Sequence, residues 1–340
     1  MSAVTTSITT AEELRDVIAD ARHAGTPLDV RGGGSVLDRL PTGGEQVLSV
    51  AGMTGVVSHA ADDLTITVRA GTPLAELAAV LAEVGQECPI EPAGPAGAAS
   101  AGTVGGRIAT GLAGPRQLGA GRVRDWVLRV AFVTGAGHVA AAGGVTVKDV
   151  SGYDICRLLT GSWGTLAVIT EVTLKVRPLA RHRGWYVSDG PRHALDRHLY
   201  RPSACTTTPT RTHVLLEGHP DDAADQAAAV GLEAGDPPDL PGTARAAVDP
   251  AALPSLAAEL GELGLRWAAQ DGVGVCHLDG DAEQLAAARA AGEHRGGRLV
   301  VLVPSLGLPA FGGPRRNVIA DRIGAALDPD GVLAPHRWTR

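Results

Sequence analysis

Apolar positions in the first half of the chain recur alternately at the spacing of helices and of strands. Residues 11–24 carry apolar side chains at helical spacing, with Thr10 and Glu13 as a capping box and Gly25 as the stop signal. Residues 64–68 alternate apolar and polar side chains, which predicts a strand. The pattern therefore predicts helices and strands in succession, as in an α/β or α+β unit.

Further elements extend this unit to about Pro178. A second helix is expected with Thr72 as N-cap and Pro73 as its first residue, and Gly85 would end it. A short apolar run predicts a helix-like turn over residues 155–159. Strands are predicted over residues 28–30, 127–133, 139–142 and 172–177.

The character of the sequence changes after Pro178. Residues 181–201 hold many arginines and histidines and few apolar positions. Such a run is typical of a solvated connecting face, although it could also attract a carboxylate substrate or an acidic partner. Beyond it, strand-like and helical segments predict a second α/β domain, and a last helix is expected over residues 316–327. The segments of the second domain are residues 213–216, 221–230, 250–260, 273–277, 281–294 and 299–303.

Length, charge and cysteine usage exclude several classes of protein. The 340 residues give room for two domains, and the net charge of −7 argues against a nucleic-acid binder, which needs a basic face. No signal peptide is visible, and no apolar run approaches the roughly 20 residues that cross a bilayer. We therefore expect a cytoplasmic protein without direct membrane insertion. No metal site is expected either, because the cysteines lack paired spacing and occur singly at Cys88, Cys156, Cys205 and Cys276.

Three glycine-rich segments are the candidate binding elements: residues 31–35, 102–106 and 161–165. Glycines leave the backbone uncovered, and successive N–H groups can converge on an anion such as a pyrophosphate. Each segment alone could equally be a turn or a hinge. Their separation by about 60 to 70 residues favours one elongated ligand, for which FAD has the required shape. Residues 135–140 match a dinucleotide-binding pattern but are better explained as a hairpin turn.

Seven motifs occur in a fixed order and carry a specific resemblance. They are Arg31-Gly-Gly-Gly-Ser35, Ala70-Gly-Thr-Pro-Leu-Ala-Glu-Leu77, Gly102-Thr-Val-Gly-Gly106, Gly114-Pro-Arg116, Val123-Arg-Asp-Trp-Val-Leu128, Gly161-Ser-Trp-Gly-Thr-Leu166 and Leu327-Asp-Pro-Asp-Gly-Val-Leu-Ala-Pro335. The series resembles the FAD-binding domain of the vanillyl-alcohol oxidase / p-cresol methylhydroxylase (PCMH-type) superfamily. Within that superfamily it is most similar to the FAD-binding E subunits of bacterial glycolate oxidases. The resemblance covers residues 10–178 and 317–336.

The resemblance implies an α+β fold. Residues 1–178 would form a PCMH-type FAD-binding domain of two α/β subdomains, and residues 179–310 a smaller α/β cap domain. Residues 311–340 would form a C-terminal helix and turn that return to the FAD-binding domain. No motif identifies a catalytic residue, which stays unknown. The motifs imply that FAD is held by Arg31, Gly32, Gly33, Gly34, Ser35, Gly102, Thr103, Gly105, Gly106, Thr110, Gly111, Gly161, Ser162, Gly164, Thr165 and Ile169.

The sequence departs from the family pattern in three places. The first glycine loop has neither the His nor the Cys that binds FAD covalently in some relatives, so FAD is expected to be non-covalent. Ala334 and His336 replace the Asn and Gly of the terminal motif. The cap lacks the His-x-Gly-Asp-Gly-Asn motif of the catalytic subunits of D-2-hydroxyacid dehydrogenases, and His213, His219 and His277 are isolated, which is more typical of structural histidines.

The resemblance implies an FAD-dependent oxidoreductase that acts on CH–OH groups. It would move a hydride from a small 2-hydroxy acid or alcohol to flavin N5, and on to a partner or a quinone. Two alternatives stay open: a non-catalytic FAD-carrying or scaffolding subunit of a dehydrogenase complex, and a stand-alone flavoenzyme acting on a specialised metabolite. The expected partners are a small-molecule substrate, a catalytic flavoprotein subunit and an iron–sulfur subunit. Tyr153 could stack on the flavin or be an ordinary half-buried tyrosine.

Overall fold

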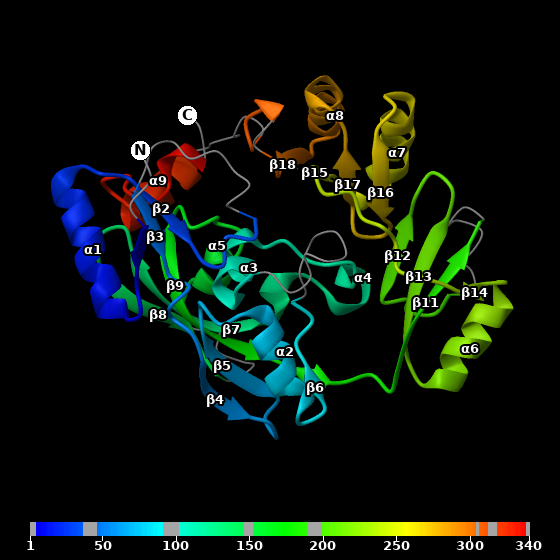
Figure 1. Ribbon diagram of the computed structural model, residues 1–340, viewed down its shortest axis with the longest axis horizontal. Coiled ribbons are helices and arrows are strands. Elements are labelled where there is room, and N and C mark those ends of the chain that lie inside the picture. The colour runs from blue at the N-terminus through cyan, green and yellow to red at the C-terminus, as the bar shows by residue number, and fades with distance from the viewer. Residues whose placement is uncertain are drawn as a thin grey trace.

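Two main sheets, together with a short two-stranded one, form the N-terminal part of the molecule (Figure 1). The computed structural model describes residues 5–36, 46–90, 102–145, 152–189, 199–303, 306–311 and 318–337. The smaller sheet is parallel and has the order β1 (Thr5–Ser7), β3 (Gln46–Ser49), β2 (Leu28–Arg31). The larger sheet is antiparallel and has the order β4 (Val56–Ala60), β5 (Thr65–Arg69), β9 (Ala167–Lys175), β7 (Val127–Thr134), β8 (Val139–Gly143).

Helices cover these sheets and bury their apolar faces. Helix α1 (Ala11–Ala24) packs on the parallel sheet, and its capping box at Thr10 and left-handed Gly25 confirm the predicted ends. The hairpin turn expected between β7 and β8 is also present. The remaining helices and short strands of this part are α2 (Leu74–Ala82), β6 (Gln86–Glu87), α3 (Val104–Thr110), α4 (Gln117–Ala120), η2 (Val123–Trp126), α5 (Ile155–Leu159) and β10 (Arg177–Pro178).

Two predicted details of this region are wrong. Thr72 does not cap α2, because its hydroxyl is occupied by the backbone N–H and carbonyl of Gly55 at 3.0 and 3.3 Å. Pro73 takes the N-cap position, and the helix begins at Leu74. In addition, residues 104–110 form α3, a helix that was not predicted, with Thr103 as the N-cap that accepts a hydrogen bond from Gly106.

An eight-stranded antiparallel sheet forms the second part of the molecule. Its order is β14 (Glu233–Ala234), β11 (His182–Ser188), β13 (Thr212–Gly218), β12 (Ala204–Thr207), β16 (Arg266–Gln270), β17 (Val275–Asp279), β15 (Ala244–Ala247), β18 (Arg298–Val301). Its helices are α6 (Pro220–Ala229), η4 (Pro250–Ala252), α7 (Leu253–Glu262) and α8 (Ala282–His294). The predicted helices and strands of this part are therefore confirmed, and β11, β12, β14, β15 and β16 are additions.

The basic run at residues 181–201 is not a connecting face. Its first part is β11, which lies between β14 and β13 in the sheet. Its last arginines and histidines at 192–198 lie outside the described residues. The strand was missed because its polar residues, His182 and Arg183, and its apolar residues at 185–187 each stand next to one another, so it shows no apolar alternation.

All three helices of the second part lie on one face of its sheet. Helices α7 and α8 pack on Ala246, Cys276 and their apolar neighbours, and α6 packs on Cys205 and Val214. The pairing registers place these residues on the same side. Among the described residues of the second part, no helix covers the other face. This face is directed toward the N-terminal part, since β15 and β18 lie between α8 and α3 in Figure 1.

The C-terminal segment pairs with the N-terminal part of the chain. Helix α9 (Val318–Leu327) leads into a turn, and Leu333 forms a parallel bridge with Leu28 of β2. The N–H of Ala334 donates to the carbonyl of Leu28 at 2.8 Å. A final turn, η6 (Pro335–Arg337), then brings Arg337 beside β2.

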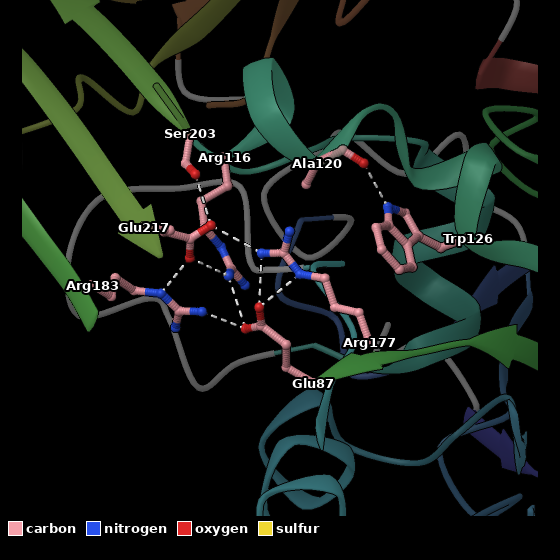
Figure 2. Close-up of polar contacts among 8 residues, drawn as sticks. All are labelled: Glu87, Arg116, Ala120, Trp126, Arg177, Arg183, Ser203 and Glu217. Atoms are coloured by element: carbon pink, nitrogen blue, oxygen red, sulfur yellow. Dashed lines mark hydrogen bonds and ion pairs between the residues drawn. The ribbon is translucent and has the colours of Figure 1, made fainter. Parts of the chain in front are cut away.

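A buried network of ion pairs joins the two parts (Figure 2). Glu87 of β6 and Glu217 of β13 share Arg116, which donates to their carboxylates at 2.8 and 3.0 Å. Arg177 and Arg183 also pair with both carboxylates. Since Glu87, Arg116 and Arg177 belong to the first part and Glu217 and Arg183 to the second, the network fixes their relative position.

The network lowers the pKa of its acids. Burial alone would raise the pKa of the Glu217 carboxyl, but the hydrogen bond from Ser203 and the charges of Arg116 and Arg183 outweigh it and lower the pKa to about 2. For Glu87, burial is likewise outweighed by Arg116 and Arg183, and its pKa is lowered. Carboxylates with lowered pKa stabilise the fold above the pKa of the unfolded chain and lose that contribution as the pH falls toward the folded value.

We expect Glu217→Gln to change the acid stability profile. Wild type should lose stability between about pH 5 and pH 2, as Glu217 and Glu87 take up protons. The variant should be about 2 kcal/mol less stable at pH 7, because the buried Arg116 loses one of its two carboxylate partners and keeps only Glu87. Its further loss of stability below pH 5 should be smaller than that of wild type. Urea unfolding at several pH values measures both effects. Glu233→Gln, at an exposed position of β14, is the control; parallel profiles for wild type and Glu217→Gln would contradict the prediction.

Candidate functional site

The first two glycine segments lie against each other. A Cβ at Gly32 would lie 2.3 Å from Oγ1 of Thr103, and one at Gly33 would lie 3.3 Å from Cα of Gly102. Residues 32–35 directly follow β2, so the parallel sheet brings this loop to the start of α3. Two segments about 70 residues apart in the sequence therefore form one wall with little side-chain cover.

Helix α3 is held close to the larger sheet by a glycine. The N–H of Gly105 donates to the carbonyl of Ala70 at 2.7 Å. A Cβ at Gly105 would meet Cβ of Ala70 at 2.6 Å, so any other residue would push the helix away. This contact leaves Gly106 and Thr110 on the side of α3 that faces the first loop.

The third glycine segment docks on the end of α3. The N–H of Gly161 donates to the carbonyl of Ile108 at 3.0 Å, and that of Trp163 to the carbonyl of Ala109 at 2.7 Å. Trp163 has a φ of 58°, an uncommon conformation for a bulky residue, and its ring meets Phe311 edge-on at 4.9 Å. Tertiary packing holds this conformation beside the site.

The three segments enclose two adjoining cavities that share Gly32, Gly106 and Thr110. They hold about 360 and 430 Å³ of empty space, respectively. The first is lined by Gly32, Gly33, Gly34, Ser35, Val36, Leu74, Gly102, Thr103, Gly106, Arg107 and Thr110. The second is lined by Val30, Gly32, Val50, Gly105, Gly106, Ala109, Thr110, Trp163, Gly164, Ala167, Val168, Ile169 and Arg337.

Most of the residues expected to bind the cofactor line these cavities, and five do not. Arg31 does not line either cavity, and its Nε donates to Oδ2 of Asp29 at 2.8 Å. Gly111 and Gly161 approach each other where α3 ends, and the hydroxyl of Thr165 donates to the carbonyl of Ser162. The five residues, Arg31, Gly111, Gly161, Ser162 and Thr165, therefore belong to the structure behind the cavity lining.

Several lining residues were not expected from the sequence. Arg337 is buried and donates to the carbonyls of Trp163 and Val30 and to the carboxylate of Asp29. No local pattern marks it, because its partners are 174 to 308 residues away in the sequence. The others are mostly apolar residues with no chemical signature, namely Val30, Val36, Val50, Leu74, Ala109, Trp163, Ala167 and Val168, together with Arg107 on α3.

The polar residues considered as catalytic candidates lie elsewhere. Tyr153 is 94% exposed, so it is neither half-buried nor directed at the cavities. His213 and His219 contact the carbonyl of Asp236 and the carboxylate of Asp221. His277 is buried in the eight-stranded sheet, where burial and the charge of Arg245 lower its pKa to about 3. Among the described residues, no group of three His, Cys, Asp or Glu side chains could hold a metal ion.

The site fits an elongated cofactor with phosphate groups and rings. Glycines at Gly32, Gly33 and Gly102 expose backbone in one cavity, and apolar walls at Val50 and Val168 enclose the other. A loop of successive glycines suits phosphate oxygens, and an apolar cavity suits a flat ring system. FAD has both parts, and this arrangement of the described residues fits it.

Comparison with known proteins agrees with this fit. Residues 3–143 match the family model described as FAD binding domain. Glycolate oxidase subunit GlcE of Escherichia coli is 43% identical over 172 residues, which are 50% of this chain and 47% of that protein. D-lactate dehydrogenase of Archaeoglobus fulgidus is 38% identical over 173 residues, or 50% and 38% of the two chains. D-2-hydroxyglutarate dehydrogenase of Xanthomonas citri is 34% identical over 167 residues, or 48% and 34%.

The fold matches over almost the whole chain. A solved structure of alkyldihydroxyacetonephosphate synthase covers 97% of this chain, with 76% of its own length, a TM-score of 0.65 and 14% sequence identity. The protein therefore has the PCMH-type FAD-binding fold, and its cofactor is FAD. Half of the chain is similar to the glycolate oxidase subunit GlcE, and the matched region spans less than half the length of each curated relative named above. No helix among the described residues is long and apolar enough to cross a membrane.

Filling the cavity at Gly106 should prevent FAD binding without unfolding the protein. Gly106 lines both cavities, and a Cβ there would meet only Oγ1 of Thr103, at 3.1 Å. The side chain in Gly106→Val would occupy space that the cofactor needs. Overpacking of this kind costs about 1–3 kcal/mol, which corresponds to roughly 5- to 150-fold weaker binding.

Titration of the flavin-free protein with FAD measures this loss, and circular dichroism checks the fold. The control is Gly292→Val on α8, since a Cβ there meets nothing within 4 Å. Equal FAD affinity in Gly106→Val and wild type would show that these cavities do not hold the cofactor.

Proposed function

We propose that the protein is an FAD-dependent oxidoreductase that oxidises a small 2-hydroxy acid or a related alcohol. The observation that carries this proposal is the pair of adjoining, glycine-lined cavities beside α3; the first is lined entirely by residues of the region that matches a FAD binding domain, and the second in part. The names of the relatives support the substrate class, because they include a glycolate oxidase subunit, a D-lactate dehydrogenase and a D-2-hydroxyglutarate dehydrogenase.

The chain's own residues would hold the cofactor, and FAD when bound supplies a hydride acceptor. The loop of residues 32–35 and the Thr103 backbone would bind its phosphates, and Trp163 and Ile169 would contact its apolar parts. Binding would be non-covalent, which is supported by the absence of His, Cys and Tyr among the described residues that line the cavities.

The domain bounds belong to the same proposal. Residues 1–178 and 311–340 would form the FAD-binding unit, and residues 179–310 would form a cap over the substrate. The pairing of Leu333 with Leu28 and the single sheet built between His182 and Val301 support this division.

Electrons would leave the protein through a partner subunit or a quinone. Two relatives are named as subunits of glycolate oxidase, GlcE of Escherichia coli and GlcD of Bacillus subtilis. By analogy we propose that this chain works in a complex with a catalytic flavoprotein subunit and an iron–sulfur subunit, in the cytoplasm.

A second function is favoured by the lining of the cavities: a FAD-carrying subunit that performs no substrate oxidation. Among the described lining residues none is Asp, Glu or His. A side chain that takes up the substrate's hydroxyl proton at neutral pH would normally be one of these types. In that case a partner subunit would oxidise the substrate.

Anaerobic reduction separates the two functions. We expect the purified protein to show a flavin absorbance spectrum and to bleach within seconds to minutes on addition of glycolate or D-lactate. Ethylene glycol, which has a hydroxyl but no carboxylate, is the control and should bleach it at least about tenfold more slowly. A yellow protein that no 2-hydroxy acid bleaches would support the carrier function, and a colourless protein that does not bind added FAD would refute both.

A further inference from the structure

Arg245 of β15 is a buried cation without a partner. Its side chain is 8% exposed, and among the described residues it makes no hydrogen bond and no ion pair. Burial lowers its pKa to about 10, and the other charges that act on it, Arg107 and Arg298, are also positive. A buried charge with no counter-charge is strongly unfavourable, so such a group is retained where it has a ligand.

Arg116 is a second buried arginine, and its surroundings are those of an arginine with a structural role. Arg116 is as buried as Arg245, at 4% exposure, and it lies between the carboxylates of Glu87 and Glu217. The chain thus provides acids for a buried arginine that has a purely structural role. The contrast suggests that the counter-charge of Arg245 comes from outside the described chain.

Other polar groups lie on the same face of the sheet. The registers pair Arg245 with His277 and Thr206 with Gln270, which places all four side chains on the face without helices. Gln270 Nε2 lies 3.2 Å from His277 Nε2. Among the described residues, Oε1 of Gln270 and the hydroxyl of Thr206 are buried and lack a partner.

This face is directed at the flavin site. Val300 of β18 stands directly opposite Arg245 in the sheet and packs in the apolar cluster that contains Trp163 and Leu112. Trp163 lines the second cavity. Arg107 of α3, whose charge acts on Arg245, lines the first cavity. Two cavity-lining residues therefore connect Arg245 to the site from different sides.

We propose that Arg245 binds the carboxylate of the substrate, with Thr206 and Gln270 as nearby hydrogen-bonding groups. The planar guanidinium can donate two parallel hydrogen bonds to one carboxylate, a geometry that neutral alcohols cannot use. The inference rests on the proposed function for the identity of the ligand. It explains why a protein that oxidises hydroxy acids would prefer them to simple alcohols, and why an unpaired cation is kept in this sheet.

The test measures anion binding without turnover. Oxalate, a dicarboxylate without an oxidisable hydroxyl, is titrated into the purified flavoprotein, and the melting temperature and flavin spectrum are followed. We expect oxalate to raise the melting temperature of wild type and to perturb its spectrum. Sodium chloride at equal ionic strength, whose anion cannot accept the two parallel hydrogen bonds of a guanidinium, should do neither. Equal effects of the two salts would refute a carboxylate site.

Two substitutions of Arg245 test its role, and for Arg245→Met we expect stability to rise while anion binding weakens. Arg245→Met should raise the melting temperature of the ligand-free protein by about 2–4 °C, since a buried charge is removed, and should weaken oxalate binding by at least about 30-fold. Arg245→Lys keeps the charge but not the planar pair of donors and should weaken oxalate by about tenfold. The matched control is Arg181→Gln, an exposed arginine just before β11 whose charge is not among those that act on Arg245, and it should change neither quantity.

The outcomes distinguish this inference from the proposed function. If 2-hydroxy acids reduce the flavin of Arg245→Met as fast as that of wild type, the inference fails and the proposed function stands. If no acid reduces the wild-type flavin but oxalate binding depends on Arg245, the anion site stands and the proposed oxidation fails. A ligand-free Arg245→Met that is less stable and binds oxalate like wild type would assign Arg245 a structural role and overturn the inference.

Discussion

The close approach of backbone to backbone around helix α3 is the contact on which the site depends. Gly105 lets the helix rest on Ala70, and Gly111 lets its end meet Gly161. At each point the space that a side chain would fill is taken by another main chain. The cavities exist because these contacts fix three distant segments at a short separation while the glycines between them leave the interior empty. The glycines thus have two effects: they allow the close backbone contacts that stabilise this region, and they leave space for the cofactor.

The two buried arginines Arg116 and Arg245 differ in the charges that surround them. Arg116 and its acids join the two parts of the molecule, so the sheet of the second part is held in place over the site. Arg245 lies on that sheet with no acid beside it among the described residues. Leaving a buried charge without a partner costs several kcal/mol more than burying it in a hydrogen-bonded ion pair. The fold thus places two acids beside Arg116, whereas the charges that act on Arg245 are positive. This difference supports an anion-binding site at Arg245.

Much of this arrangement could be predicted from the sequence, and the failures have physical reasons. Helix α1 and strand β5 have strong local signals, namely a capping box and strict alternation, and both were predicted. The glycine segments could be found because backbone exposure has a signature in the sequence. Helix α3 was missed because a seven-residue helix rich in glycine has low intrinsic propensity and is stabilised by tertiary contacts. Strand β11 was missed because ion pairs replace apolar alternation there, and Arg337 because its partners are distant in the sequence.

The pairing of residues 333–334 with Leu28 also bears on how the molecule forms. Strand β2 and the loop after it emerge early in synthesis, yet the backbone groups of Leu28 that bond to Val332 and Ala334 find these partners only about 300 residues later. A contact of such sequence separation forms slowly, because closing a long loop costs entropy before the contact is made. The first wall of the flavin site therefore stays incomplete until the last helix has been made. Stable cofactor loading would therefore follow the synthesis of residues 332–334, and an earlier association with FAD would be weak and reversible.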